Sequence, residues 1–159
     1  MTKFRKITNL SPLRRRLLKN DRFTPRPSLR VTVQVPETHL QKIVEAVITK
    51  DALKYGDYDC VTFKTARGVQ QFRSLGTGRN VKTERAVEVP CCELSFFLEH
   101  DETIAIGVLK AIYNAHPYEE PVIALTPCIR TLHIRGRDED NPNRFWNSVS
   151  QDWVPEEHR

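Results

Sequence analysis

The chain has 159 residues, four cysteines and a formal net charge of +5. Its length predicts one domain with tails, and no apolar stretch approaches the roughly 20 residues of a membrane helix, so we expect a soluble protein without a membrane span. The cysteines have neither the spacing of a zinc site nor the density of a secreted disulfide scaffold, which predicts reduced core residues in an intracellular protein: Cys60, Cys91, Cys92 and Cys128.

The positive charge is concentrated in the first 30 residues. They hold ten lysines and arginines against one acid, Asp21, and carry +9, whereas the remaining residues hold 15 basic and 19 acidic side chains and carry −4. The body of the protein is therefore mildly acidic, which disfavours nucleic acid as its partner.

Residues 1–28 form a basic leader by composition. The leader is rich in arginine and poor in acids, and its apolar residues recur at spacings of three and four: Phe4, Ile7, Leu10, Leu13 and Leu17. Such a composition is typical of an organellar transit peptide, and a disordered tail or a nucleic-acid-binding arm are the alternatives. We therefore expect a cytoplasmic protein, or a mitochondrial one if the leader is a transit peptide.

The domain is predicted over residues 29–135, and its first half predicts a strand, a helix and a hairpin. Val31 to Val35 alternates as a strand. Residues 58–65 and 69–75 predict two further strands, joined as a hairpin across residues 66–68. Between the first and second strands, Pro36 opens a helix with one apolar face, which we expect to lie across a sheet: Leu40, Ile43, Val44, Val47 and Ile48.

The second half predicts a strand, a helix and a last strand. Residues 86–99 form the strongest strand, with Cys92, Leu94, Phe96 and Leu98 on one face. Asp101 is the predicted N-cap of the second helix, whose apolar stripe is Ala105, Val108, Leu109 and Ile112. Residues 122–134 form the last strand, which Pro127 assigns to an edge or a bend.

This order of elements predicts an α+β fold of the ferredoxin-like kind. Both helices are expected on one face of an antiparallel sheet, with an extra hairpin. The bare sheet face and the long last strand are liabilities for a monomer, so we expect neighbouring subunits to cover them.

Residues 136–159 form a polar tail that contains four apolar residues at helical spacing. They follow Asn141 and Pro142 and predict a short helix that docks on the body or on a partner, with a loose tail as the alternative: Phe145, Trp146, Val149 and Trp153.

The segment Ala115–Pro121 places an imidazole, a phenol and two carboxylates in a turn bracketed by prolines. The negative end of the preceding helix favours His116 as imidazolium. Glu119 and Glu120 point to opposite sides if a strand begins there, so one of them faces His116. A structural turn, a ligand or metal site, and an acid–base pair are the three interpretations.

A metal site at this corner needs help from elsewhere in the chain. One histidine with one carboxylate, His116 and Glu119, falls short of the three or four ligands of a tight site, and His39 or a symmetry mate would have to complete it. Residues 76–80, Gly-Thr-Gly-Arg-Asn, have the glycines and the arginine of an anion cradle, but no helix follows them, and we expect a simple loop.

Three motifs occur in an order found in known proteins: residues 35–40, Val-Pro-Glu-Thr-His-Leu; residues 56–65, Gly-Asp-Tyr-Asp-Cys-Val-Thr-Phe-Lys-Thr; and residues 115–121. Together, over about residues 30–128, they resemble the small inserted domain of Nif-three-like dinuclear metal proteins, here free-standing. The last motif is also similar to the CutA family, and both belong to the broader PII-like ferredoxin fold.

The resemblance implies a homotrimer whose clefts between subunits bind a small molecule or a metal ion. The ligand-binding candidates are His39, Thr65, His116, Tyr118, Glu119 and Glu120, and a divalent ion would use His116 and Glu119. The two halves that hold the dinuclear metals in Nif-three-like proteins are absent, so that chemistry does not carry over. The long loop of PII proteins is also missing if residues 66–68 join the hairpin, and the segment around residues 76–85 looks shortened.

The sequence therefore predicts a non-catalytic binding or regulatory protein of the Nif-three-insert and CutA-like type. Its ligand, a small molecule or a divalent metal ion, is expected between subunits. The alternatives are a metal-assisted hydrolase that uses His116, Glu119 and His39, and an interaction protein that acts through its basic leader.

Overall fold

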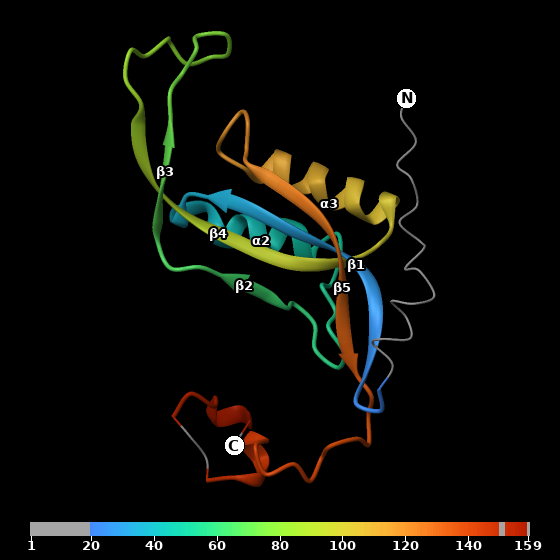
Figure 1. The fold of residues 1–159 in the computed structure, drawn as a ribbon. Coiled ribbons are helices and arrows are strands. Elements are labelled where there is room, and N and C mark those ends of the chain that lie inside the picture. The colour runs from blue at the N-terminus through green and yellow to red at the C-terminus, as the bar shows by residue number, and fades with distance from the viewer. Residues whose placement is uncertain (1–19, 150–151, 159) are drawn as a thin grey trace. The chain divides into compact units, whose positions relative to one another are not determined.

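The computed structural model describes residues 20–149 and 152–158 (Figure 1). Among them, residues 26–130 form one compact unit, and residues 20–25 with 131–149 and 152–158 form a second, smaller one. The described strands and α-helices, in chain order, are strand β1 (Phe23–Val35), helix α2 (Leu40–Ile48), strands β2 (Thr62–Lys64), β3 (Gly68–Phe72) and β4 (Val87–Glu99), helix α3 (Glu102–Ala115) and strand β5 (Ile123–His133), and a 3₁₀ turn, Glu37–His39, leads into α2.

The described strands form one five-stranded sheet in the order β2-β4-β1-β5, with β3 also paired to β4. β4 is antiparallel to β1, β2 and β3. One helix joins β1 to β2 and another joins β4 to β5, which is the ferredoxin-like plan. The predicted α+β class is confirmed, and β5 lies at an edge as the proline in its sequence predicted.

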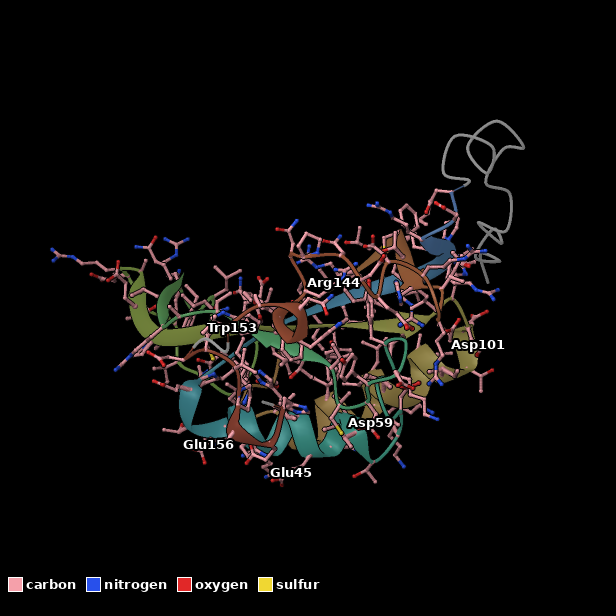
Figure 2. The ribbon with its side chains drawn as sticks, turned by 90° about the horizontal axis from the view of Figure 1, so that it is seen from below. Glu45, Asp59, Asp101, Arg144, Trp153 and Glu156 are labelled. Carbon is pink, nitrogen blue, oxygen red and sulfur yellow. The ribbon has the colours of Figure 1, made fainter. Side chains whose placement is uncertain are left out.

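The core is built by the alternation of apolar residues along the two central strands. Val31 lies opposite Phe96 and Val33 opposite Leu94, and all four side chains are buried. Burial of one strand face excludes a one-residue slip, because a slip would turn every apolar side chain outward. Both helices cover this face, as predicted (Figure 2), and they add apolar residues to the same core: Ile43, Val44, Val47, Ala105, Val108 and Ile112.

Helix α3 begins as its sequence predicted. The Asp101 side chain accepts a hydrogen bond from the Ile104 backbone N–H at 3.0 Å, and the Asp101 backbone is extended. This bond satisfies one of the amides that the first helical turn leaves unpaired, and the carboxylate lies at the positive end of the helix dipole.

Replacing this cap should destabilise the domain by a modest and specific amount. We expect Asp101→Ala to lower the free energy of unfolding by about 1 kcal/mol, because an amide at the helix start loses its acceptor. Asp101→Ser keeps a capping oxygen and is the matched control, expected to stay close to wild type. Urea denaturation measures both variants, and equal losses in both would contradict a capping role.

The predicted hairpin across residues 66–68 is wrong. β2 and β3 both pair with β4: Lys64 lies opposite Leu94 and Gly68 opposite Cys91. Between these two pairs the chain advances by four residues from β2 to β3 but by only three residues along β4. One extra residue on one side of a strand pair is the signature of a β-bulge. The side chain of Thr65 fixes the bulge, since its Oγ1 accepts a hydrogen bond from the Glu93 backbone N–H at 2.9 Å.

The central hairpin instead joins β3 to β4 through residues 73–86. Its loop is tied internally: the Ser74 N–H donates to Thr83 Oγ1, and the Thr83 N–H donates back to the Ser74 carbonyl. The expectation that this domain lacks a long loop at its central hairpin is therefore also wrong. The sequence misled because residues 66–68 contain a glycine, which marks the bulge and not a turn.

The first strand begins earlier in the chain than the sequence predicted. β1 begins at Phe23, so the last residues of the predicted leader are strand. The other leader predictions concern residues 1–19, which lie outside the described residues.

In the tail, two short 3₁₀ turns, Phe145–Asn147 and Glu156–His158, replace the predicted helix. Phe145 makes edge-to-face ring contacts with Trp146 and Trp153, at centroid distances of 5.0 and 6.0 Å. The aromatic residues in the tail therefore cluster, and residues 136–149 and 152–158 contain no α-helix, although the spacing had predicted one.

All four cysteines are free thiols, but they do not all lie in the core. Cys91 and Cys92 are buried on opposite faces of β4, whereas Cys60 is exposed and Cys128 is half-buried. Burial raises the pKa of the Cys91 and Cys92 thiols, which keeps both protonated and poorly reactive. Within the described part of the chain, no helix is long and apolar enough to cross a membrane.

Candidate functional site

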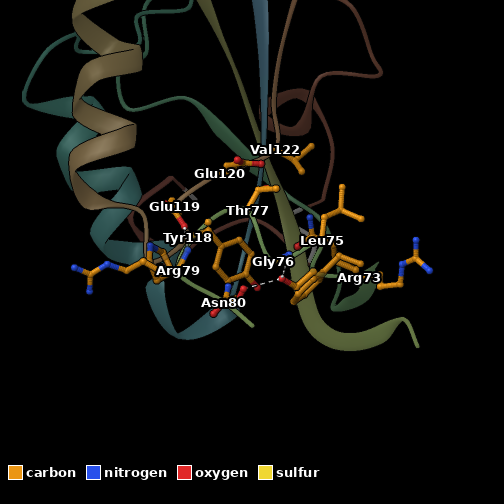
Figure 3. Close-up of a pocket in the computed structure, with 15 residues that line it drawn as sticks. Arg73, Leu75, Gly76, Thr77, Arg79, Asn80, Tyr118, Glu119, Glu120 and Val122 are labelled. Carbon is orange, nitrogen blue, oxygen red and sulfur yellow. Dashed lines mark hydrogen bonds between the residues drawn. The ribbon is translucent and has the colours of Figure 1, made fainter. Parts of the chain in front are cut away.

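A pocket of about 660 Å³ lies between the β3–β4 loop and the segment that follows α3 (Figure 3). One wall consists of Gln70 and Phe72 on β3 together with residues 73–80 of the loop. The opposite wall consists of residues 117–120 and Val122. This volume lies within the range of small-molecule sites, roughly 300–1,000 Å³.

His116 lies at the C-terminal end of α3 and acts as a structural hub. Its ring is buried, with 8% of its surface exposed. The Tyr118 backbone N–H donates to Nδ1 at 3.0 Å, so Nε2 carries the proton and donates to the Gln34 carbonyl at 3.0 Å. His116 is therefore a neutral imidazole that joins the corner to β1, with both nitrogens engaged.

The expectation of an imidazolium at this position is wrong. Burial lowers the pKa of His116 below its usual 6.5, and the nearby His39 lowers it further, while the Gln34 carbonyl partly opposes them. Desolvation outweighs the helix dipole here, because the ring is buried and the dipole acts on exposed groups by about 1 kcal/mol or less.

His116 should give the protein a specific sensitivity to acid. Its folded-state pKa is depressed, so the unfolded chain binds the proton more readily once the pH falls below about 6.5. Stability is complete above that pH and declines as the pH falls toward the folded-state pKa, with a slope of at most about 1.4 kcal/mol per pH unit.

The measurement is urea denaturation of wild type and His116→Gln at pH 7.5 and 5.5. We expect wild type to lose more stability between these values than the variant, whose side chain does not titrate. The other histidines are present in both proteins and cancel in the comparison. Equal losses in both proteins would exclude His116 as the source.

Glu119 reaches across the pocket to the β3–β4 loop. Its Oε2 accepts a hydrogen bond from the Arg79 backbone N–H at 3.2 Å. A Cβ at Gly78 would lie 2.8 Å from the same oxygen, so any larger residue at this position would displace the Glu119 carboxylate. The sequence predicted a simple loop at residues 76–80, and in the structure a backbone N–H of this loop is paired with the protein's own Glu119 carboxylate.

Tyr118 and Glu120 complete the wall after α3. The Tyr118 ring packs edge-to-face on His116 with centroids 5.0 Å apart, and burial raises the pKa of its hydroxyl, with Cys91 contributing. Glu120 is exposed at the pocket. Glu119 and Glu120 both line the pocket. The sequence predicted that strand alternation would point them to opposite sides, but β5 begins only at Ile123, so neither residue is in a strand.

The two remaining candidates, His39 and Thr65, do not line this pocket. The His39 ring is hydrogen-bonded to the Thr38 hydroxyl at 3.0 Å, and Thr65 borders a smaller cavity of about 150 Å³ with Cys91 and Gln70. Among the described residues, no group of three or more histidine, cysteine or acidic side chains is placed to hold a metal ion. Since both nitrogens of His116 are already hydrogen-bonded, a site made of His116 and Glu119 would have to break these contacts.

Comparison with known proteins places the fold. No protein-family model matches the chain, and no curated protein matches it. A Bacillus cereus protein related to NIF3 superposes with a TM-score of 0.56 and 23% identity, over 70% of this chain and 28% of that one. CutA1 from Shewanella sp. SIB1 superposes with a TM-score of 0.50 and 12% identity, over 65% and 82%.

The fold is CutA-like. This confirms the resemblance predicted from the motifs, at the level of the fold. The chain spans 28% of the length of the NIF3-related structure, so it matches only a part of that protein.

In this CutA-like fold, the sequence motifs located one wall of the pocket and missed the other. Gln70, Phe72 and Val122 line the pocket but were not among the candidate residues. The glycines at 76 and 78 were the available signal, because paired glycines permit a loop to approach a side chain closely. Because the hairpin was predicted at residues 66–68, the loop of residues 73–86 was not expected beside the segment that follows α3.

Proposed function

We propose that this protein is a non-catalytic small-molecule-binding module that works as a homotrimer, with its ligand in the pocket between the β3–β4 loop and residues 117–122. The observation that carries the proposal is the pocket itself, whose two walls are held together by the hydrogen bond between Glu119 and Arg79. A preformed concave site with apolar and polar lining is the usual form of a ligand site.

The hydrogen bonding of His116 supports binding over catalysis. A general base needs a free nitrogen lone pair, and here the lone pair of Nδ1 already accepts a hydrogen bond from the Tyr118 backbone N–H. The metal-assisted hydrolase alternative draws no support from this geometry. The leader alternative concerns residues 1–19, outside the described part of the chain.

Exposed apolar groups on the edge formed by β2 and β3 support assembly. Phe63 and Val69 are 65% and 66% exposed, and the edge carries backbone groups that a second chain can pair with. Light scattering of the purified chain should therefore give a mass of three copies of 18.5 kDa. A monomer at micromolar concentration would contradict the trimer.

A thermal-shift screen of metabolites, nucleotides and divalent metals tests the ligand. A bound compound should raise the melting temperature by mass action, because it binds the folded chain and not the unfolded one. The matched variant is Val122→Trp, which fills the pocket from a residue that is 46% exposed. A compound that stabilises wild type but not the variant supports the proposal; compounds that stabilise both equally, or none at all, contradict it.

A further inference from the structure

We propose that the N-terminal segment, residues 1–19, docks on an exposed aromatic surface of the acidic tail in the same chain. This surface, the tail face, consists of the rings of Phe145, Trp146 and Trp153 with the exposed acids of the tail. The inference does not depend on the pocket or its ligand. Three features carry it: the exposed rings, the opposite charges of the two segments, and the place where the N-terminal segment joins the described chain.

The tail face presents two large rings to solvent. Trp146 and Trp153 are 56% and 67% exposed, although both rings contact Phe145. The Trp146 indole N–H donates a hydrogen bond to the Glu139 carbonyl at 3.1 Å, which orients the ring before any partner binds. Tryptophan is enriched among the residues that contribute most to binding energy at interfaces, so an oriented and exposed pair indicates a docking surface.

The tail is acidic, whereas the N-terminal segment is basic. Residues 136–149 and 152–158 hold six acids and two arginines, a net charge of −4, and residues 1–19 hold seven lysines and arginines and no acid, a net charge of +7. Five of the tail acids are exposed: Glu139, Asp140, Asp152, Glu156 and Glu157. Complementary charge favours the N-terminal segment as occupant and disfavours nucleic acid or an anionic lipid surface.

The N-terminal segment also has the apolar residues that can cover the rings. They recur at spacings of three and four, and Arg14, Arg15 and Arg16 lie between two of them: Phe4, Ile7, Leu10, Leu13 and Leu17. Arginine stacks favourably on the face of tryptophan, in addition to pairing with carboxylates. Docking therefore withholds these arginines from any other acidic partner, and the tail acts as an internal mask for the segment.

The N-terminal segment joins the described chain beside the tail. The Arg22 guanidinium pairs with Asp138 at 3.4 Å, and the Arg22 carbonyl accepts a hydrogen bond from the Ile134 N–H at 2.9 Å. Residue 19 thus precedes by three positions an arginine that is bound to the tail. A segment tethered this closely has an effective concentration on the order of millimolar, well above that of a second copy at micromolar concentration. The chain's own segment is therefore the favoured occupant.

Tryptophan fluorescence tests the docking, because the chain has two tryptophans and both lie on the tail face. The test variant is the full chain with Arg14→Glu, Arg15→Glu and Arg16→Glu together. We expect its emission to shift to the red and acrylamide to quench it more strongly than wild type. The matched control reverses three exposed lysines elsewhere and should keep the wild-type emission: Lys42, Lys50 and Lys110. No shift in the test variant, or an equal shift in the control, would overturn the inference.

A charge swap separates docking from an indirect effect of the substitutions. Adding Asp140→Arg, Glu156→Arg and Glu157→Arg to the test variant places opposite charges on the two segments again, so the wild-type emission should return. Emission that stays shifted to the red would contradict the pairing of the two segments.

A synthetic peptide of residues 1–19 measures whether the tail face is already occupied. We expect the peptide to bind the test variant and to restore its emission, but not to bind wild type, whose own segment covers the rings. The same Kd for both proteins, or no binding to either, would overturn the inference. A red shift of wild type on dilution would assign the tail face to the segment of a second copy and overturn docking within the chain.

Discussion

Phe96→Ala should cost the domain about 3–5 kcal/mol of unfolding free energy, the usual loss for truncating a buried phenylalanine. Phe96 is 2% exposed and lies on β4, opposite Val31 of β1 on one side and Thr62 of β2 on the other. Removing the ring leaves a cavity that rigid strands cannot close. Since a domain has only about 5–15 kcal/mol in total, the variant should be largely unfolded in mild urea.

The matched control is Phe63→Ala on β2, which removes the same atoms from a side chain that is 65% exposed. We expect the control to change stability by about 0.5 kcal/mol or less in the isolated chain. Urea denaturation followed by far-UV circular dichroism measures both variants. Similar losses in the two would mean that the core does not lie between this sheet and its helices.

Arg130→Met should lower the unfolding free energy by about 2–3 kcal/mol, more than the loss of an exposed ion pair would cause. The Arg130 side chain is 4% exposed. One of its nitrogens donates to the Lys54 carbonyl at 3.0 Å, and the guanidinium lies 5.5 Å from the centre of the Tyr55 ring. Methionine keeps most of the volume and loses these contacts.

Glu99→Gln separates these contacts from the ion pair. Glu99 accepts a hydrogen bond from Arg130, but its own side chain is 59% exposed, so water can solvate the groups that lose the ion pair. We expect this variant to cost less than about 1 kcal/mol. If chemical denaturation shows the two variants to be equally destabilised, the ion pair and not the Lys54 contact secures the segment.

Periodicity in the sequence was sufficient to predict the layers of the fold. The alternation in β1 and β4 and the apolar stripes of both helices each point to one buried face, and physical burial enforces that pattern. The N-cap at Asp101 was equally local, since its partner is three residues away. These elements could be predicted because their determinants are short in range.

The edge strand could not be predicted in the same way. The pairing of Gly68 with Cys91 joins residues far apart in sequence, and a glycine in a polar stretch signals a turn or a bulge equally well. The predicted protonation state of the site was wrong for a related reason. Burial lowers the pKa of His116, and that burial comes from packing against β1, where the ring contacts the Gln34 carbonyl 82 residues away.

The bulge at Thr65 determines how a second chain can extend the sheet. A partner strand that runs beside β3 finds five residues in continuous register and then meets a shift of one residue. The partner must end there or carry a bulge of its own, because its hydrogen-bonding groups no longer align with those of β2. The edge thus admits a short strand in one register and resists indefinite addition of copies, which favours a closed assembly over a fibre.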